Sequence, residues 1–79
     1  MAKYDPLRRY LARQKPARVE LSFAEVERLI GAYLPKAAAR SQWWDLDDDP
    51  PASVQIQAWR AAGYRARLVA AERVAFERA

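Results

Sequence analysis

The chain has 79 residues, a mass of 9.1 kDa and a net charge of +4, and this length is typical of one domain covering residues 1–79. It contains neither cysteine nor histidine, which excludes a disulfide framework, thiolate zinc ligands and the commonest general base. No apolar run approaches the roughly 20 residues of a membrane span, and the N-terminus lacks the apolar segment of a secretion signal. We therefore expect a cytoplasmic protein that is not an enzyme, binds no membrane and holds no metal or cofactor.

The charge is unevenly distributed along the chain. Six basic side chains fall within residues 1–19 and five arginines within 50–79, whereas seven of the ten acidic residues fall within 20–49. We expect folding to gather the basic side chains of both chain ends on one surface, with the aspartate-rich segment 45–49 pointing elsewhere. Such a surface would attract the phosphates of a nucleic acid.

The first elements predicted are a helix and a short strand. Asp5 is placed to cap a helix over residues 4–15, and Pro6 fits its first turn, where the missing N–H costs nothing. Pro16 ends this helix, because the residue before a proline avoids the helical region. Apolar and charged residues then alternate, which predicts a strand over residues 18–23.

A capping box marks the start of the second helix. The Ser22 hydroxyl can accept from the amide of Glu25, while the Glu25 carboxylate returns to the amide of Ser22. Leu21 and Val26 are spaced for a hydrophobic staple across this start. Gly31 supplies the left-handed stop.

A short helix, a loop and a longer helix follow. Pro35 and an alanine-rich run predict a helix of about two turns that ends near Trp44. The aspartates and prolines of residues 45–51 predict a solvated loop. The next helix is expected to begin within 49–53 and to end at Gly63.

The last helix leads into a predicted β-hairpin. Val54 and Trp59 are expected to face inward from the helix. Alternating residues over 64–68 and 74–78 predict two strands that pair around a turn at 70–72. The order helix, strand, helix, short helix, helix and β-hairpin predicts an α+β domain with a winged-helix-like arrangement, in which the hairpin is the wing.

A run of short motifs extends over most of the chain. They read L-[ST]-F-x-E-[IV]-E, L-P, W-W, Q-x-x-A-W, A-G-[WY] and V-x-F-x-R, and they fall at residues 21–27, 34–35, 43–44, 55–59, 62–64 and 74–78. In this run, residues 19–78 resemble a small bacterial domain family of unknown function. The chain differs from the pattern at Ala37, where the family has Ser, and at Leu46, where it has Asn. The resemblance implies a compact domain and brings no activity, catalytic residue or cofactor.

The adjacent Trp43 and Trp44 are the most unusual pair of residues. Neighbours on a helix point about 100° apart, so both cannot share one buried face. We expect one to pack in the core beside Trp59 and the other to lie at its rim. Two interpretations stay open, namely large aromatic side chains that build a small core, and a stacking platform or partner anchor.

Polar side chains on the later helices and the hairpin indicate a nucleic-acid contact. Glutamine and arginine pair with adenine and guanine edges in a major groove, and arginines on the hairpin, including Arg73, would contact phosphates. The candidate DNA-binding residues are Lys36, Arg40, Gln55, Gln57, Arg60, Arg65 and Arg67.

Other functions are less favoured by the sequence. The aspartates of segment 45–49 lack the glycine bend and the later glutamate of a calcium loop, and two prolines follow them. The serines have no histidine with which to form a catalytic triad. The expected function is non-catalytic DNA binding by a small regulator. The alternative is a protein-interaction module, antitoxin-like, partner-binding or homodimeric, that uses Trp43 or Trp44.

Overall fold

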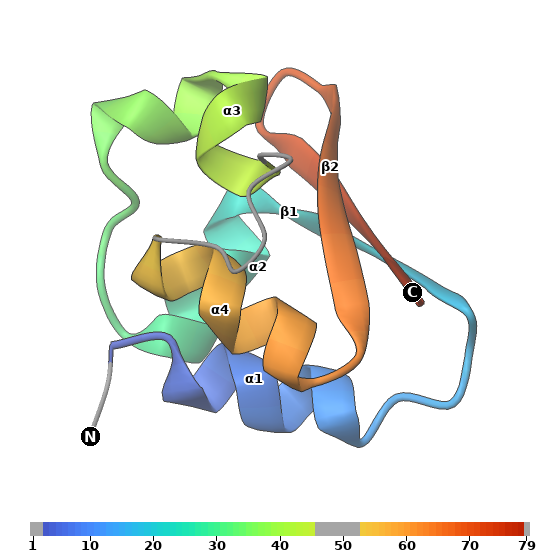
Figure 1. The fold of residues 1–79 in the computed structure, drawn as a ribbon. Coiled ribbons are helices and arrows are strands. Elements are labelled where there is room, and N and C mark those ends of the chain that lie inside the picture. The colour runs from blue at the N-terminus through green and yellow to red at the C-terminus, as the bar shows by residue number, and fades with distance from the viewer. Residues whose placement is uncertain (1–2, 46–52, 79) are drawn as a thin grey trace.

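A computed structural model describes residues 3–45 and 53–78 of the chain (Figure 1). The elements are helix α1 (Asp5–Ala12), strand β1 (Arg18–Ser22), helix α2 (Phe23–Ile30), the 3-10 helix η1 (Lys36–Ala39), helix α3 (Ser41–Trp44), helix α4 (Val54–Ala61) and strands β2 (Tyr64–Ala70) and β3 (Arg73–Arg78). This mixture of helices and one small sheet confirms the predicted α+β class.

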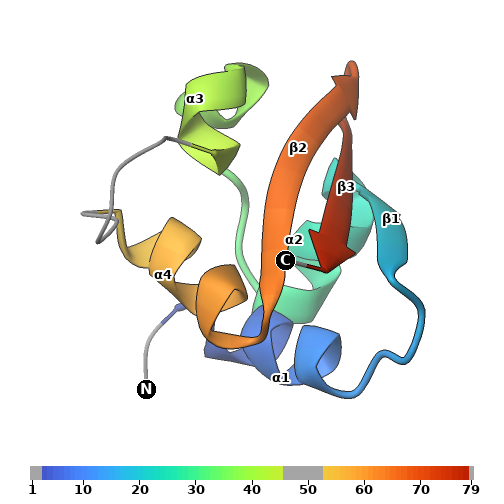
Figure 2. The ribbon, with the colours of Figure 1, turned by 45° about the vertical axis from the view of Figure 1, so that its right-hand side comes forward.

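The strands of the described residues form an antiparallel sheet in the order β1-β3-β2. Val19 of β1 and Ala66 of β2 both lie opposite Phe76 of the central strand. Helices α3 and α4 lie on the same side of β2 (Figure 2).

Most buried side chains of the sheet, among them Val74 and Phe76, pack in the core with those of the helices. Ala75 is also buried, but it lies opposite Glu20 and Arg67. The opposite face of the sheet carries charged residues from all three strands, namely Arg18, Glu20, Arg67, Arg73 and Glu77.

Aromatic rings form the centre of the core. The ring of Trp44 stacks on that of Trp59 with centroids 5.4 Å apart, and the Trp59 ring meets Phe76 edge-on at 5.7 Å. Leu7 and Leu11 of α1 close the core and are fully buried. Trp44 is therefore a core residue, whereas Trp43 is half-buried at the rim. The prediction that one tryptophan packs in the core beside Trp59 and the other lies at its rim is confirmed.

The start and end of α2 follow the sequence prediction. The Ser22 hydroxyl accepts from the Glu25 amide at 3.1 Å, and the Glu25 carboxylate accepts from the Ser22 amide at 3.0 Å. Gly31 ends the helix with a φ of 69°, in the left-handed region that favours glycine. The capping box and the stop signal are both confirmed.

The predicted end of α1 and the predicted continuity of the short helix are wrong, whereas α3 ends at Trp44 as predicted. Tyr4 occupies the N-cap of α1, and Asp5 lies inside the first turn, where it forms an ion pair with Arg8 at 3.7 Å. The helix ends at Ala12, before the predicted residue 15. The short helix is split into η1 and α3, because Arg40 between them has extended backbone angles, with φ −99° and ψ 138°.

The face that α4 buries also differs from the prediction. Val54 is 66% exposed, while Gln55, Ile56 and Trp59 are buried. The β-hairpin is confirmed, with strands longer than predicted and an irregularity between Leu68 and Ala70. No glycine stands in its turn, and Glu72 takes the positive φ of 56° instead.

Candidate nucleic-acid interface

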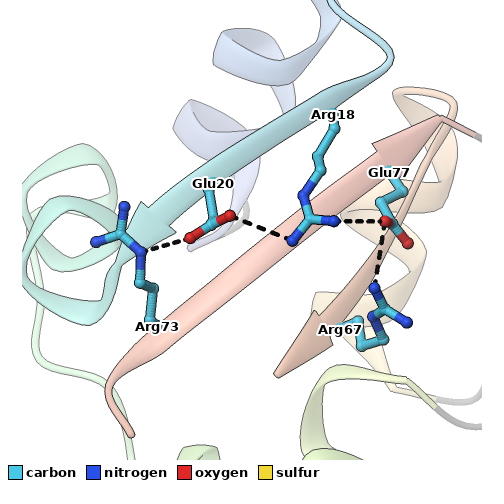
Figure 3. Close-up of polar contacts among 5 residues, drawn as sticks. All are labelled: Arg18, Glu20, Arg67, Arg73 and Glu77. Carbon is cyan, nitrogen blue, oxygen red and sulfur yellow. Dashed lines mark hydrogen bonds and ion pairs between the residues drawn. The ribbon is translucent and has the colours of Figure 1, made fainter. Parts of the chain in front are cut away.

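The exposed face of the sheet carries arginines that alternate with glutamates (Figure 3). We call this row the charged ladder, and it consists of Arg73, Glu20, Arg18, Glu77 and Arg67. The ion pairs within it measure 2.6 Å between Arg73 and Glu20 and 3.2 Å between Glu20 and Arg18. Glu77 then pairs with Arg18 at 3.3 Å and with Arg67 at 3.4 Å. Each pair is exposed to water and salt, so each contributes little to stability.

The ion pair between Glu20 and Arg73 shifts the pKa of both groups. The hydrogen bond from Arg73 lowers the pKa of Glu20 below its usual range, with a further contribution from Arg18. In return, Glu20 raises the pKa of Arg73. Two of the three hairpin arginines predicted to contact phosphates, Arg67 and Arg73, are therefore held beside carboxylates that repel a phosphate backbone.

Two further predicted DNA contacts meet an aspartate. Asp45 accepts from Arg60 at 3.3 Å and from Arg65 at 3.1 Å. The aspartate-rich segment was expected to point away from the arginines, and its first residue instead binds two of them. Asp47, Asp48 and Asp49, together with Leu46, lie outside the described residues. The expected basic surface free of carboxylates is not found on the sheet or around Asp45.

A different part of the molecule brings several predicted site residues together. A hollow of about 630 Å³ opens between the η1–α3 segment and the start of α4. We call it the Trp43 hollow, and its lining residues are Ala37, Arg40, Gln42, Trp43, Ser53 and Gln55. The extended backbone of Arg40 separates η1 from α3, and residues of both elements and of the start of α4 line the hollow.

Two cations of this region have no carboxylate partner. The guanidinium group of Arg40 and the ammonium group of Lys36 are exposed, and neither forms an ion pair or a side-chain hydrogen bond within residues 3–45 and 53–78. They differ in this respect from Arg60, Arg65 and Arg67. An unpaired exposed cation is available to a phosphate at little desolvation cost.

Three hydrogen bonds from side chains to backbone carbonyls fix the backbone beneath the hollow. Gln55 is only 8% exposed, and its Nε2 donates to the carbonyl of Trp43 at 3.1 Å. The Trp44 indole donates to the carbonyl of Ala38 at 2.7 Å, and the Trp59 indole donates to that of Trp44 at 3.2 Å. Gln55 therefore positions Trp43 in addition to lining the hollow. Trp44 has no exposed surface that a partner could contact without repacking the core.

The structure separates the remaining candidates. Gln57 lies on the exposed side of α4, beside a second hollow between α1 and α4. The predicted residues that meet at the Trp43 hollow are Arg40, Trp43 and Gln55, with Lys36 on the adjoining η1. Gln42 and Ser53 also line it, and no spacing in the sequence predicts that these two meet, because the contact depends on how α3 and α4 pack.

The Trp43 hollow offers groups that can bind a ligand. No helix within the described ranges is long and apolar enough to cross a bilayer. Within those same ranges, no three acidic side chains gather as metal ligands would. The Trp43 hollow combines an aromatic ring, an unpaired cation, amides and a hydroxyl, which suits an anion attached to a planar group.

Comparison with known families agrees with this description. The model of a domain of unknown function, DUF7662, matches residues 4–79, and the chain belongs to this family. The expected likeness to a small domain family of unknown function is thereby confirmed, and the match includes α1, which precedes the motif run. No curated protein and no solved structure matches the chain.

Proposed function

We propose that this domain is a non-catalytic DNA-binding module that contacts its target through the Trp43 hollow. The single observation that carries the proposal is the unpaired guanidinium of Arg40 beside the half-buried indole of Trp43. A guanidinium supplies a phosphate contact, and an indole supplies a stacking surface for a base. Lys36 adds a second cation on the adjoining η1.

A winged-helix-like fold is part of this proposal. The order of α1, β1, α2, α4 and the β2–β3 hairpin supports it, as does the pairing of β1 with β3. In a helix-turn-helix protein, the helix that precedes the wing enters the major groove. Here that helix is α4, which exposes Val54 and Gln57 and holds Arg60 against Asp45. The exposed side chains of α4 thus offer few base-reading groups, and we place the contact at the hollow instead.

The charged ladder provides the contrast that makes the proposal testable. Its arginines resemble Arg40 in charge and in exposure, but each faces a glutamate within 3.4 Å. Arg67→Ala therefore removes the same charge from the protein as Arg40→Ala does, at a site where we expect no phosphate. The pair of variants separates a local contact from a general effect of net charge.

The test is a fluorescence anisotropy titration with end-labelled duplex and single-stranded oligonucleotides at low salt. We expect binding that weakens as salt rises, because phosphate contacts release counterions. Arg40→Ala should lower the affinity by about tenfold, since hydrogen bonds to charged groups are the strong ones. Arg67→Ala should leave the affinity within about twofold. Absence of binding to either form of DNA at low salt would refute the proposal.

A protein partner is the second candidate, and the exposed aromatic side chains favour it. Tyr33 is 87% exposed beside a hollow on α2, and Trp43 is half-buried at its own hollow. Exposed aromatic residues often anchor protein interfaces. Sedimentation of the purified chain tests the homodimeric form of this alternative. A dimer that Trp43→Ala converts to a folded monomer would support it, and a monomer at all concentrations would count against it.

A further inference from the structure

We infer that the Trp43 hollow receives one unpaired base, so that the domain prefers single-stranded or locally unpaired DNA to a continuous duplex. This inference rests on the proposed function and specifies the form of DNA that the site takes. It follows from the ring contacts of Trp43, from the groups beside that ring and from the stacking of bases in a duplex.

The indole of Trp43 is held by neighbouring rings. It meets Trp44 edge-on at 4.7 Å between centroids and Tyr4 edge-on at 6.0 Å, and it lies 6.0 Å from Trp59. The bond from Gln55 to the Trp43 carbonyl fixes the backbone below the ring. Because these contacts already order the Trp43 ring, it loses little conformational entropy when a base stacks on it.

The groups around the ring match the edges and the phosphate of a nucleotide. Gln42 and Ser53 bring an amide and a hydroxyl group, which can donate to and accept from a base edge, whereas the amide of Gln55 is buried and donates to the carbonyl of Trp43. Among the lining residues that the structure describes, Arg40 is the charged one, and it suits the phosphate attached to that base. The volume of about 630 Å³ falls within the roughly 300–1,000 Å³ of typical small-ligand sites.

The bases of a continuous duplex stack on one another, so none of them presents a free face to the ring of Trp43. Proteins that read a continuous duplex insert a protruding helix or ribbon into a groove, whereas proteins that enclose a base must take it out of the stack. The hollow is a shallow depression that opens to solvent, with Trp43 half-buried at its lining. The preference for an unpaired base therefore follows from the geometry, since an unpaired base reaches the hollow without breaking base pairs.

Three labelled oligonucleotides of one sequence test the inference. They are the single strand, its blunt duplex, and the same duplex with one unpaired nucleotide in the middle. We expect the single strand and the bulged duplex to bind about tenfold tighter than the blunt duplex, in keeping with the stacking of one base. Trp43→Leu should reduce this ratio to near one. Tyr33→Leu removes an exposed aromatic residue from another surface and should leave the ratio unchanged.

A second measurement uses the unaltered protein, in case the Trp43→Leu variant does not fold. Photo-crosslinking to a single strand that carries 5-iodouracil, followed by peptide mapping, should place the crosslink within residues 40–44 or 53–55. Crosslinks confined to α1 or to the charged ladder would overturn the inference. Equal affinity for all three oligonucleotides would also overturn it, and the proposed function would still hold if Arg40→Ala weakened that binding. Failure to bind any of them would refute the proposed function itself.

Discussion

Replacing Trp44 with phenylalanine should lower the free energy of unfolding by about 2–3 kcal/mol, although the residue next to it tolerates the same change. The Trp44 side chain is fully buried among the rings of Trp59, Phe23 and Phe76. Its indole nitrogen donates the 2.7 Å bond to the carbonyl of Ala38. Phenylalanine keeps one aromatic ring in place but removes the second ring and the donor.

The magnitude follows from these two losses. The space left by the missing ring costs about 1–2 kcal/mol, as a partial large-to-small change in a core. The carbonyl left without its donor costs roughly 1 kcal/mol more. A chain of 79 residues has a stability on the order of 4–12 kcal/mol, so the variant remains folded with a melting temperature lower by about 8–24 °C.

Urea denaturation followed by far-ultraviolet circular dichroism measures this change without relying on tryptophan emission. Trp43→Phe is the matched control, because Trp43 is only half-buried and its indole nitrogen makes no hydrogen bond within the described residues. We expect the control to lose less than about 1 kcal/mol. A larger loss in Trp43→Phe than in Trp44→Phe would refute the assignment of Trp44 to the core and Trp43 to the hollow.

Three other predictions concern stability. Ser22→Ala removes the acceptor of the Glu25 amide and should lower the unfolding free energy by about 1 kcal/mol in the same urea assay, and an unchanged midpoint would contradict this. The carboxylates of Glu20 and Glu25 have lowered pKa values, because Arg73 donates to the first and the Ser22 amide to the second. Their contribution is present above the ordinary value of 4.5 and is lost as the pH falls through the lowered pKa, so the melting temperature should drop on acidification toward pH 3. Glu20→Gln should flatten that drop, and a steeper one would contradict the sign. Glu72→Gly should raise the unfolding free energy by about 0.5–1 kcal/mol, because glycine adopts a φ of 56° without steric penalty, and destabilisation in thermal melts would refute it.

Much of the local structure was predictable from neighbouring residues. The capping box of Ser22 and Glu25 and the stop at Gly31 act through partners three or four positions away, so their signals are complete within one window of sequence. The hairpin was predictable from alternation alone, although its turn uses Glu72 where glycine would be expected.

The split between η1 and α3 was not predictable in this way. The buried Trp44 indole reaches back to the carbonyl of Ala38, and Arg40 between them takes an extended conformation. Alanine-rich helical propensity predicts a continuous helix there, and the packing of one tryptophan overrides it. The side of α4 that is buried depends likewise on a tertiary contact, the bond from Gln55 to the carbonyl of Trp43.

The ion pairs were likewise not predictable from the sequence, because their partners lie far apart along the chain. Asp45 meets Arg60 and Arg65 across 15 and 20 positions, and the charged ladder joins residues up to 59 positions apart. Block-wise net charge describes the chain before folding and carries no information about such partners. The candidate site therefore lies at the two cations beside the Trp43 hollow and not at the arginines of the hairpin.

The salt dependence of DNA binding is the most direct measurement of the central claim. Plots of the logarithm of affinity against the logarithm of salt concentration, taken for the unaltered chain, Arg40→Ala and Arg67→Ala, count the phosphates that each cation neutralises. We expect a slope for Arg40→Ala that is shallower by about 0.7 with a single strand, and a slope for Arg67→Ala equal to that of the unaltered chain. Equal slopes for Arg40→Ala and the unaltered chain, with a shallower slope for Arg67→Ala, would place the contact on the charged ladder and contradict the claim.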